Sequence, residues 1–350
     1  MARNENLTKA RAGKNDEFYT QFDDIQREMN AYLEFDRDVF RGKTILLPCD
    51  DPEWSNFTKF FVANFAFYGL KKLISTSYAP AAVMRGEEGA DPRGRVFVLE
   101  ADENGDGRVD MNDLKWSYLE GDGDFRSPEV TALRDEADFV ITNPPFSIFR
   151  EFLAWIMEGG KRFSVIGNMN AITYKDVFGH IAVNRLWLGP SISSGDREFR
   201  VPEHYPLEAA GCRVDEQGRK YIRVKGVRWF TNIDHGRRHQ PIPLMSASDN
   251  LRFNPKMAGK AAYDRYDNYD AIEVPFTSAI PADHDGPMGV PISFLDKYCP
   301  EQFEILNAND LRLNDRVPVK PHGLIKDKDG TVVGDPKPRY ARILIRRIAA

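Results

Sequence analysis

The stretch "DFVITNPPFSIFREF", from Asp138 to Phe152, decides the fold. Its apolar beginning predicts a buried strand, and the residues after the prolines have the apolar spacing of a helix. Pro144 and Pro145 separate the two elements. Each proline fixes a φ angle, lacks a backbone N–H, and pushes the residue before it into an extended conformation. We therefore expect a stiff loop at the carboxyl end of a strand, where α/β sheets bind their ligands.

Predicted strands and helices alternate on both sides of this stretch. Apolar runs of strand length occupy residues 43–48, 71–78, 94–101, 138–142, 162–168 and 184–189. Helical spacing is found over 23–33, 55–70, 127–137 and 147–160, with Ser55 and Ser127 as N-caps and Gly69 near one end. This alternation predicts an α/β fold with a doubly wound, mostly parallel sheet and helices on both faces.

The pattern changes after about residue 190. Residues 212–224, "CRVDEQGRKYIRV", predict a hairpin with its turn at 215–218, and loops rich in proline and glycine follow. We expect a catalytic domain over 1–190, whose polar residues 1–15 are mobile, and an irregular, β-rich region over 191–350 that partly completes the sheet.

Composition and charge restrict the class of protein. The 350 residues are 42% hydrophobic, enough for one large domain or two ordinary ones. The polar N-terminal residues do not resemble a signal peptide, no apolar stretch is long enough to span a bilayer, and the three cysteines are far apart. These features predict a cytoplasmic protein with neither a disulfide framework nor a zinc site.

The net charge of −5 is unevenly spread, with +4 on residues 181–350 and −9 on the remainder. An acidic total argues against indiscriminate binding of polyanions. The basic stretch "GRKYIRVKGVRW", residues 218–229, has the composition of a strip that follows a phosphate backbone, and equally that of a solvated strand face.

The residues of the proline loop suit one kind of chemistry. Asn143 and free carbonyls can accept both hydrogens of an exocyclic amino group, and Phe146 offers a flat face for a planar ring. Such a grip would aim the nitrogen lone pair and draw electron density onto it. The alternative is a rigid connection from strand to helix without a substrate.

The segment "VITNPPF", residues 140–146, resembles the signature of amino-group methyltransferases that use S-adenosylmethionine (SAM). Four further segments resemble the EcoRI-type adenine-specific DNA methyltransferases, and the resemblance covers roughly residues 13–235: "KNDEFYTQFDDIQREM" (14–29), "LLPCDDPEWSNFTKFF" (46–61), "EGDGDFRS" (120–127) and "GDREFRVP" (195–202). The fold implied is a Rossmann-like SAM-methyltransferase sheet, followed by a target-recognition region.

This resemblance implies roles for particular residues. Asn143 and the Pro144 carbonyl would hold the target amino group, Pro145 would complete the rigid motif, and Phe146 would stack on a base flipped out of the duplex. The implied cofactor set is Phe18, Tyr19 and Thr20 at the methionine end, Pro48, Asp50 and Ser55 after the first strand, and Asp124 and Phe125 at the adenine. The usual glycines after the first strand are missing here, and methyl transfer itself requires no metal.

The implied partner is double-stranded DNA, with a cognate restriction endonuclease as a candidate second partner and no membrane. Candidate DNA-binding residues cluster downstream of the catalytic segments: Arg197, Arg200, Lys225, Arg228, Arg237 and Arg238. Each of them alone has the alternative of a solvated surface charge.

Residues 102–113, "DENGDGRVDMND", follow the spacing of a calcium loop. The candidate ligands are Asp102, Asn104, Asp106, Arg108, Asp110 and Asp113. A strand rather than a helix precedes the loop, and an aspartate replaces the usual final glutamate, so a turn rich in aspartate and asparagine is the alternative.

Three functions therefore remain open. The first is site-specific methylation of the N6 amino group of adenine in DNA, with base flipping. The second is amino-methylation of an RNA base or of a protein glutamine. The third is a non-enzymatic, calcium-stabilised nucleic-acid-binding protein, against which the intact proline motif argues.

Overall fold

The computed structural model describes residues 20–48, 50–53, 55–78, 91–193, 196–201, 211–266, 269–306, 322–323, 337–338 and 341–348. The expectation that residues 1–15 are mobile lies outside these ranges. The chain forms two compact units, Met1–Met169 with Leu188–His235, and Asn170–Trp187 with Gly236–Ala350. No helix within the described ranges is long and apolar enough to cross a membrane.

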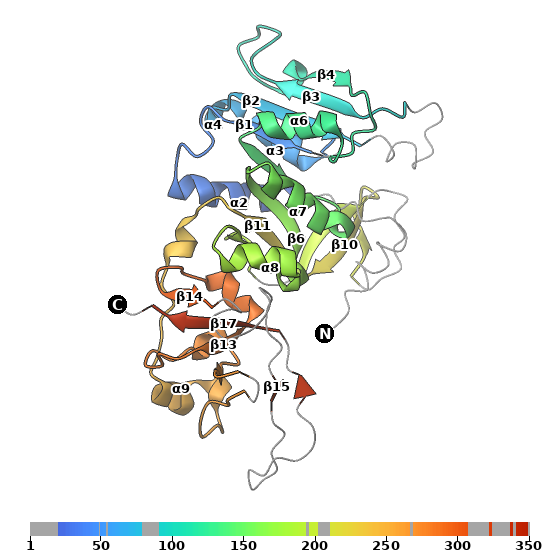
Figure 1. The fold of residues 1–350 in the computed structure, drawn as a ribbon. Helices are drawn as coiled ribbons and strands as arrows, with labels where there is room; N and C mark the ends of the chain where they lie inside the picture. Colours follow the sequence, from blue (N-terminus) through green and yellow to red (C-terminus); the bar gives the residue numbers. More distant parts are fainter. Residues whose placement is uncertain are drawn as a thin grey trace. The chain divides into compact units, whose positions relative to one another are not determined.

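A central sheet organises the first unit (Figure 1). Its eight described strands run in the order β4 (Lys115–Tyr118), β3 (Arg95–Leu99), β2 (Lys72–Ser77), β1 (Thr44–Leu47), β5 (Phe139–Thr142), β6 (Arg162–Asn168), β11 (Val227–Thr231) and β7 (Trp187–Leu188). Strands β2, β1, β5 and β6 are parallel, which confirms the predicted parallel core. Strands β3, β4 and β11 pair antiparallel with their neighbours and extend this core on both sides.

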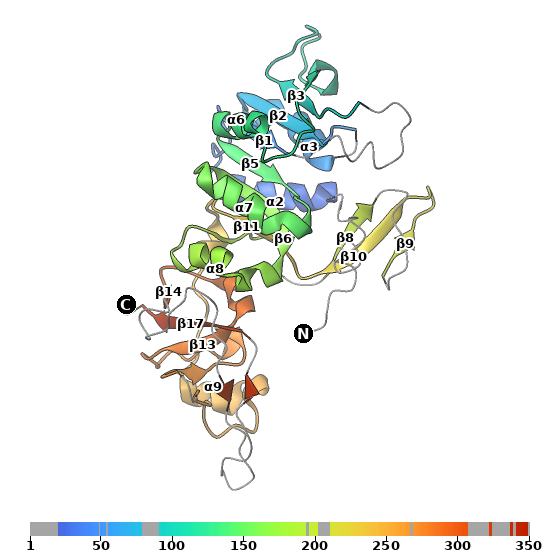
Figure 2. The same cartoon turned by 45° about the vertical axis from the view of Figure 1, so that its right-hand side comes forward.

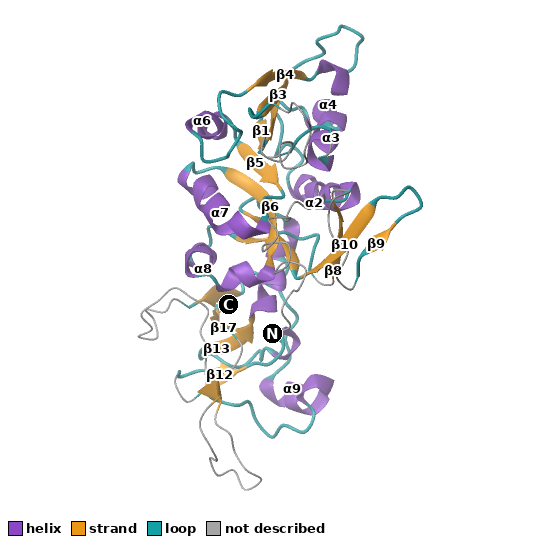
Figure 3. Ribbon diagram, turned by 90° about the vertical axis from the view of Figure 1, so that its right-hand side faces the viewer, coloured by secondary structure: helices purple, strands orange, loops and turns teal. Residues whose placement is uncertain are grey.

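Helices cover both faces of this sheet, as the alternating pattern predicts (Figure 3). One face carries α2 (Phe22–Phe35), α3 (Asn56–Ala63) and α4 (Phe65–Tyr68), and the other carries α6 (Pro128–Glu136) and α7 (Phe149–Glu158). The predicted caps are confirmed, because Ser55 Oγ accepts a hydrogen bond from Phe57 N at 3.0 Å and Ser127 Oγ accepts one from Val130 N at 3.2 Å. The single helix predicted over 55–70 is instead divided in two at Asn64.

The core of the first unit explains why its two innermost strands, β1 and β5, are mostly apolar. All four residues of β1 and all four of β5 are buried, as expected for parallel strands covered on both faces. Aromatic side chains fill the space between sheet and helices, among them Phe57, Phe60, Phe61 and Trp229. Burial of this apolar surface fixes the register of β1 and β5, and so places their carboxyl ends side by side.

A smaller antiparallel sheet of the same unit has the order β8 (Asp196–Val201), β10 (Lys220–Lys225) and β9 (Arg213–Val214) (Figure 2). The predicted hairpin is confirmed, with Gly218 N donating to Asp215 O at 3.0 Å in its turn. One face of β8 and β10 packs into the main core through Phe199, Val201, Ile222 and Val224. The opposite face carries the alternate side chains, most of which are charged.

The second unit has its own four-stranded sheet, in the order β12 (Ile272–Glu273), β13 (Met288–Pro291), β17 (Arg342–Arg347) and β14 (Phe303–Ile305). Its helices are α8 (Lys175–Ala182) and α9 (Ala247–Phe253), and a two-stranded sheet joins β15 (His322–Gly323) to β16 (Lys337–Pro338). Inside it, the buried Glu273 pairs with Arg342 at 2.6 Å.

Short 3-10 helices in both units complete the described secondary structure: Met111–Asp113, Phe146–Ile148, Met169–Thr173, Gly236–His239, Pro255–Met257, Thr277–Ala279 and Ile292–Lys297.

Candidate active site

The proline loop lies at the carboxyl end of β5, between the parallel neighbours β1 and β6. Pro144 is buried, while Asn143 and Phe146 are half-buried. The Phe146 ring meets Phe199 of β8 edge-to-face, with 6.5 Å between the ring centroids. The Pro145 carbonyl accepts a hydrogen bond from Ile148 N at 3.1 Å, so it belongs to the turn that leads into α7. The Asn143 side chain and the Pro144 carbonyl are therefore the acceptors best suited to hold an amino group.

The loop after β1 reaches this same edge of the sheet. Asp50 is buried, its Oδ1 accepts from Ser55 Oγ at 2.6 Å, and its Oδ2 accepts from Thr142 Oγ1 at 2.5 Å. The backbone carbonyl of Asp50 accepts from Thr58 Oγ1 at 2.9 Å and from Ser75 Oγ. The carboxyl group thus joins the end of β1, the start of α3 and the end of β5.

This environment changes the proton affinity of Asp50. Burial raises the pKa of its carboxyl group to about 7, although hydrogen bonds from Ser55 and Thr142 lower it. The folded protein therefore binds this proton more tightly than the unfolded chain, in which the pKa is 3.8. The stabilisation is complete below the unfolded pKa and is lost as the pH rises through about 7.

We expect the substitution Asp50→Asn to weaken the pH dependence of stability. Between about pH 5 and about pH 8, the free energy of unfolding of the wild type should lose roughly 2–3 kcal/mol more than that of the variant. Urea denaturation at the two pH values measures the difference. Parallel pH profiles for the two proteins would show that Asp50 does not titrate in this window.

Several residues of the predicted cofactor set meet beside Asp50. Thr20 is buried, and its carbonyl accepts a hydrogen bond from Asn56 Nδ2 at 2.7 Å. Pro48 is also buried, and its carbonyl lies 3.0 Å from Thr142 Oγ1. Phe18 and Tyr19 lie outside the described residues. Sequence reasoning missed the part played by Asn56, which ties the segment before α2 to the start of α3.

Asp124 and Phe125 follow a close backbone contact at the carboxyl end of β2. A Cβ added at Gly123, whose φ is +86°, would lie 2.3 Å from the Ser77 carbonyl, so only glycine allows this approach. The Asp124 carboxylate accepts from Arg126 Nη2 at 2.6 Å, and this hydrogen bond holds the pKa of Asp124 below its usual range. Phe125 is buried, with its ring centroid 5.0 Å from that of Phe152. Asp124 therefore lies at the ligand-binding edge, whereas Phe125 packs under α7.

We expect Asp124→Ala to weaken SAM binding by about 1–3 kcal/mol, because a buried adenine donor would lose its acceptor. Isothermal titration calorimetry gives the dissociation constant. Asp91→Ala is the matched control, since Asp91 holds Arg93 in the same way, with Arg93 Nη2 donating at 2.7 Å. Equal affinities for wild type and Asp124→Ala would make Asp124 a turn residue only.

The loop over 102–113 does not support the calcium prediction. Its carboxylates accept hydrogen bonds from the loop's own backbone, with Asp102 bonded to Gly105 N and Gly107 N at 2.7 Å each. Asp113 accepts from three backbone N–H groups, those of Glu103, Asn104 and Asp110. Across the described ranges, no three His, Cys, Asp or Glu side chains gather as a metal site would require. The geometry is that of a turn rich in aspartate and asparagine.

The six candidate DNA-binding residues have different environments. Arg228 is buried, and its guanidinium donates to the Val227 and Ser193 carbonyls at 2.8 Å each. In the second unit, the buried Arg238 donates to Asn184 and stacks 3.9 Å from the Trp187 ring centre, and Arg237 is half-buried beside it in the chain. These contacts favour a packing role for Arg228 and Arg238.

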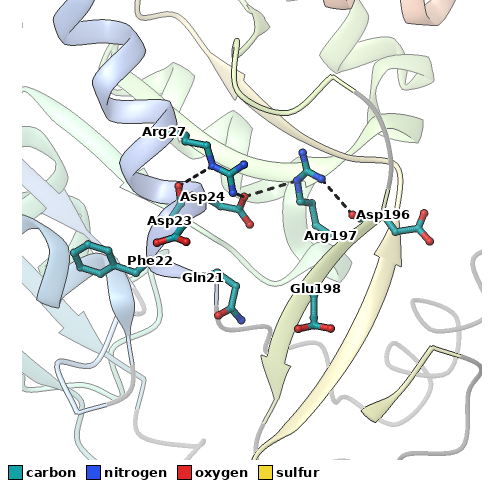
Figure 4. A pocket seen from close by; sticks show the side chains of 8 residues that line it. All are labelled: Gln21, Phe22, Asp23, Asp24, Arg27, Asp196, Arg197 and Glu198. Carbon is teal, nitrogen blue, oxygen red and sulfur yellow. Dashed lines mark hydrogen bonds and ion pairs between the residues drawn. The ribbon is translucent and has the colours of Figure 1, made fainter. Parts of the chain in front are cut away.

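A cavity of about 370 Å³ separates the start of α2 from β8 (Figure 4). Arg197 Nε points into it and lies 3.8 Å from Asp24 Oδ1, while Arg27 Nη2 bonds the same oxygen at 2.9 Å. Burial raises the pKa of Asp24, and both arginines oppose this effect. Arg197 therefore faces α2, on the core side of the small sheet.

Arg200 and Lys225 instead alternate with the core-facing residues of their strands. Register places Arg200 beside Tyr221 and Lys225 beside Asp196, on the outer face of the small sheet. Two residues that sequence reasoning did not single out, Arg213 and Arg223, belong to β9 and β10. The alternation of Arg223 with Ile222 and Val224 was a usable signal for this face, and Arg213 lies on the same face because it pairs with Tyr221.

Comparison with known proteins agrees with the sequence motifs. The family model described as "Adenine-specific methyltransferase EcoRI" matches residues 6–348. The type II methyltransferase M.EcoRI of Escherichia coli is 40% identical over 323 residues, which cover 91% of this chain and 95% of the relative. The type II methyltransferase M.MpnI of Mycoplasma pneumoniae is 33% identical over 346 residues, covering 97% and 98% of the two chains. No solved structure matches the chain. With nearly its whole length matched, this chain belongs to the EcoRI family of adenine-specific methyltransferases.

Proposed function

We propose that this protein transfers the methyl group of SAM to the N6 amino group of adenine at a specific sequence in double-stranded DNA. The observation that carries the proposal is the position of Asn143, Pro144 and Phe146 at the carboxyl end of β5, within a chain of this family. In a parallel sheet this is the edge where cofactor and substrate meet.

The residues at this edge fit SAM. Thr20 Oγ1 and Gln21 Nε2 are buried polar atoms that have no hydrogen-bond partner among the residues described, as expected beside the polar methionine end of a cofactor. The N-terminus of α3 begins at the same place, and the positive end of its helix dipole favours a carboxylate. Asp124 is available to accept from the adenine amino group.

The protein's part in the reaction is to position the acceptor. SAM supplies a methyl group already activated by its sulfonium, so alignment matters more than acid–base catalysis. Asn143 Oδ1 and the Pro144 carbonyl would accept the two amino hydrogens and stabilise positive charge that develops on the nitrogen. Phe146 would stack on the flipped base. Pro144 and Pro145 keep these groups in place, because their φ angles are fixed.

The outer face of the small sheet is the proposed DNA contact. Arg200, Arg223 and Lys225 lie on it, and Arg200 directly follows the core-facing Phe199, whose ring contacts that of Phe146. Arg200 also lies near Lys59 of α3, since its charge helps to lower the pKa of that amine, after the larger effect of burial. Two neighbouring cations suit a phosphate.

Acceptor competition tests the proposed function. Wild-type protein is incubated with methyl-labelled SAM and with duplex DNA, RNA or a glutamine-containing protein in separate reactions. We expect label in the DNA alone. Label in RNA or protein would favour the second function considered above, and the absence of SAM binding and of label would favour a non-enzymatic protein.

The DNA sequence recognised and the presence of a matched restriction endonuclease belong to the same proposal. The endonuclease is proposed because the relatives carry the name of type II methyltransferases. A cytoplasmic location is proposed from the sequence, and the two described cysteines, Cys212 and Cys299, are free thiols.

A further inference from the structure

The carboxyl group of Asp50 is bonded to the strand that carries the proposed target-binding residue. Its Oδ2 lies 2.5 Å from the hydroxyl of Thr142, although the two residues are 92 positions apart in sequence. Both are almost completely buried, with exposed fractions of 6% for Asp50 and 0% for Thr142. Thr142 immediately precedes Asn143, so its position decides where the Asn143 side chain begins.

The other bonds of Asp50 fix the carboxyl group itself. Ser55 Oγ donates to Oδ1 at 2.6 Å, and that hydroxyl also caps α3. The Asp50 carbonyl is held by Thr58 and Ser75, whose hydroxyl oxygens lie 2.9 Å apart. Because these partners come from α3 and β2, they fix the backbone of Asp50, from which its carboxyl group reaches Thr142.

We propose that Asp50 is a positioning residue, which places Asn143 for methyl transfer by holding the Thr142 hydroxyl. Asn143 follows the last residue of β5, and Pro144 restricts it to an extended conformation. A small displacement of Thr142 would therefore also displace the Asn143 side chain, because the restricted backbone of Asn143 cannot compensate for it. This inference rests on the proposed function, since it assigns Asp50 a role in the same reaction.

A double-mutant cycle tests the role. The variants are Asp50→Ala, Thr142→Val and the two combined, and each is assayed for kcat on duplex DNA, for SAM affinity by calorimetry and for melting temperature. Misplacement of a reacting group by about 1 Å can cost about 100-fold in rate. We expect each single variant to lower kcat about 10- to 100-fold. Because both changes break the same contact, we expect kcat of the double variant to be no lower than that of the less active single variant.

Two further variants separate positioning from general destabilisation. Thr142→Ser keeps the hydroxyl and should restore kcat to within about threefold of wild type, and Thr142→Val should leave SAM affinity within about threefold. Thr231→Val removes a buried hydroxyl that donates to the Phe163 carbonyl at 2.7 Å and leaves all the bonds of Asp50 in place, so it controls for general destabilisation.

The possible outcomes are distinct. The positioning role would be overturned if the losses of the two single variants multiplied in the double variant, if Thr142→Val kept the wild-type kcat, or if Thr231→Val lost as much kcat as Thr142→Val. Loss of SAM affinity in proportion to kcat would also overturn it, since Asp50 would then act only through the cofactor. A wild-type protein without activity on DNA would contradict the proposed function itself.

Discussion

Replacement of Asn143 by alanine is expected to lower the rate of methyl transfer about 100- to 1000-fold and to leave SAM binding nearly intact. The loss is large because Asn143 would act on charge that develops only as the methyl group is transferred, and removal of one such aligned group typically costs this much. SAM binding should hold, because Asn143 grips the target amino group. Single-turnover kinetics and calorimetry measure the two quantities.

Asn168→Ala is the matched control for this variant. Asn168 ends the neighbouring parallel strand β6, and its Nδ2 donates to the Lys225 carbonyl at 2.9 Å. Its removal deletes an amide at the end of the strand beside β5 and leaves the residues of the proline loop unchanged. A loss of SAM affinity greater than tenfold in Asn143→Ala would contradict the assignment of Asn143 to the target amino group and not to the cofactor.

The second large effect is expected on DNA binding. Arg200→Ala should weaken binding by about 1–3 kcal/mol, roughly 5- to 150-fold, and leave SAM affinity unchanged. Arg200 lies near Lys59, and in the part of the chain that the structure describes it forms no ion pair with an acidic side chain. Its charge therefore remains available for a phosphate or a base edge.

The response to salt and sequence identifies what Arg200 contacts. Loss of a phosphate contact should weaken binding to all DNA sequences alike and reduce the slope of the log binding constant against log salt concentration by about one. Loss of a base contact should instead relax specificity at one position of the recognised sequence. Arg213→Ala is the control, because that guanidinium is already held by Glu198 at 2.9 Å and stacks 4.2 Å from the Tyr221 ring. Equal effects of the two substitutions would show that only the net charge of the face matters.

Local chemistry made much of the fold predictable from the sequence. Ser55 and Ser127 cap the helices they precede, Gly69 ends α4 in the left-handed conformation, and the buried parallel strands β1 and β5 are short, mostly apolar runs. The proline loop was predictable for the same reason, since two fixed φ angles after an apolar run define a strand end.

Contacts between distant segments could not be predicted in this way. β11 pairs antiparallel with β6 across about 60 residues of intervening chain. The spacing of apolar residues predicts a strand but does not indicate which distant strand it pairs with. The contact between Asp50 and Thr142 likewise exists only because β1 and β5 are adjacent. Arg228 and Arg238 are candidates for DNA contact because basic residues cluster downstream of the catalytic segments, but the sequence could not show that carbonyl and amide oxygens hold their guanidinium groups.

The most direct test is the identity of the methylated atom. Duplex DNA treated with the wild-type protein and deuterated-methyl SAM is digested to nucleosides and examined by mass spectrometry. We predict N6-methyldeoxyadenosine that carries the deuterated methyl group, at adenines within one short sequence, and its loss in Asn143→Ala. The same product from Asn143→Ala at the wild-type rate, or label on cytosine in place of adenine, would contradict the assignment of this loop as the adenine-methylating site.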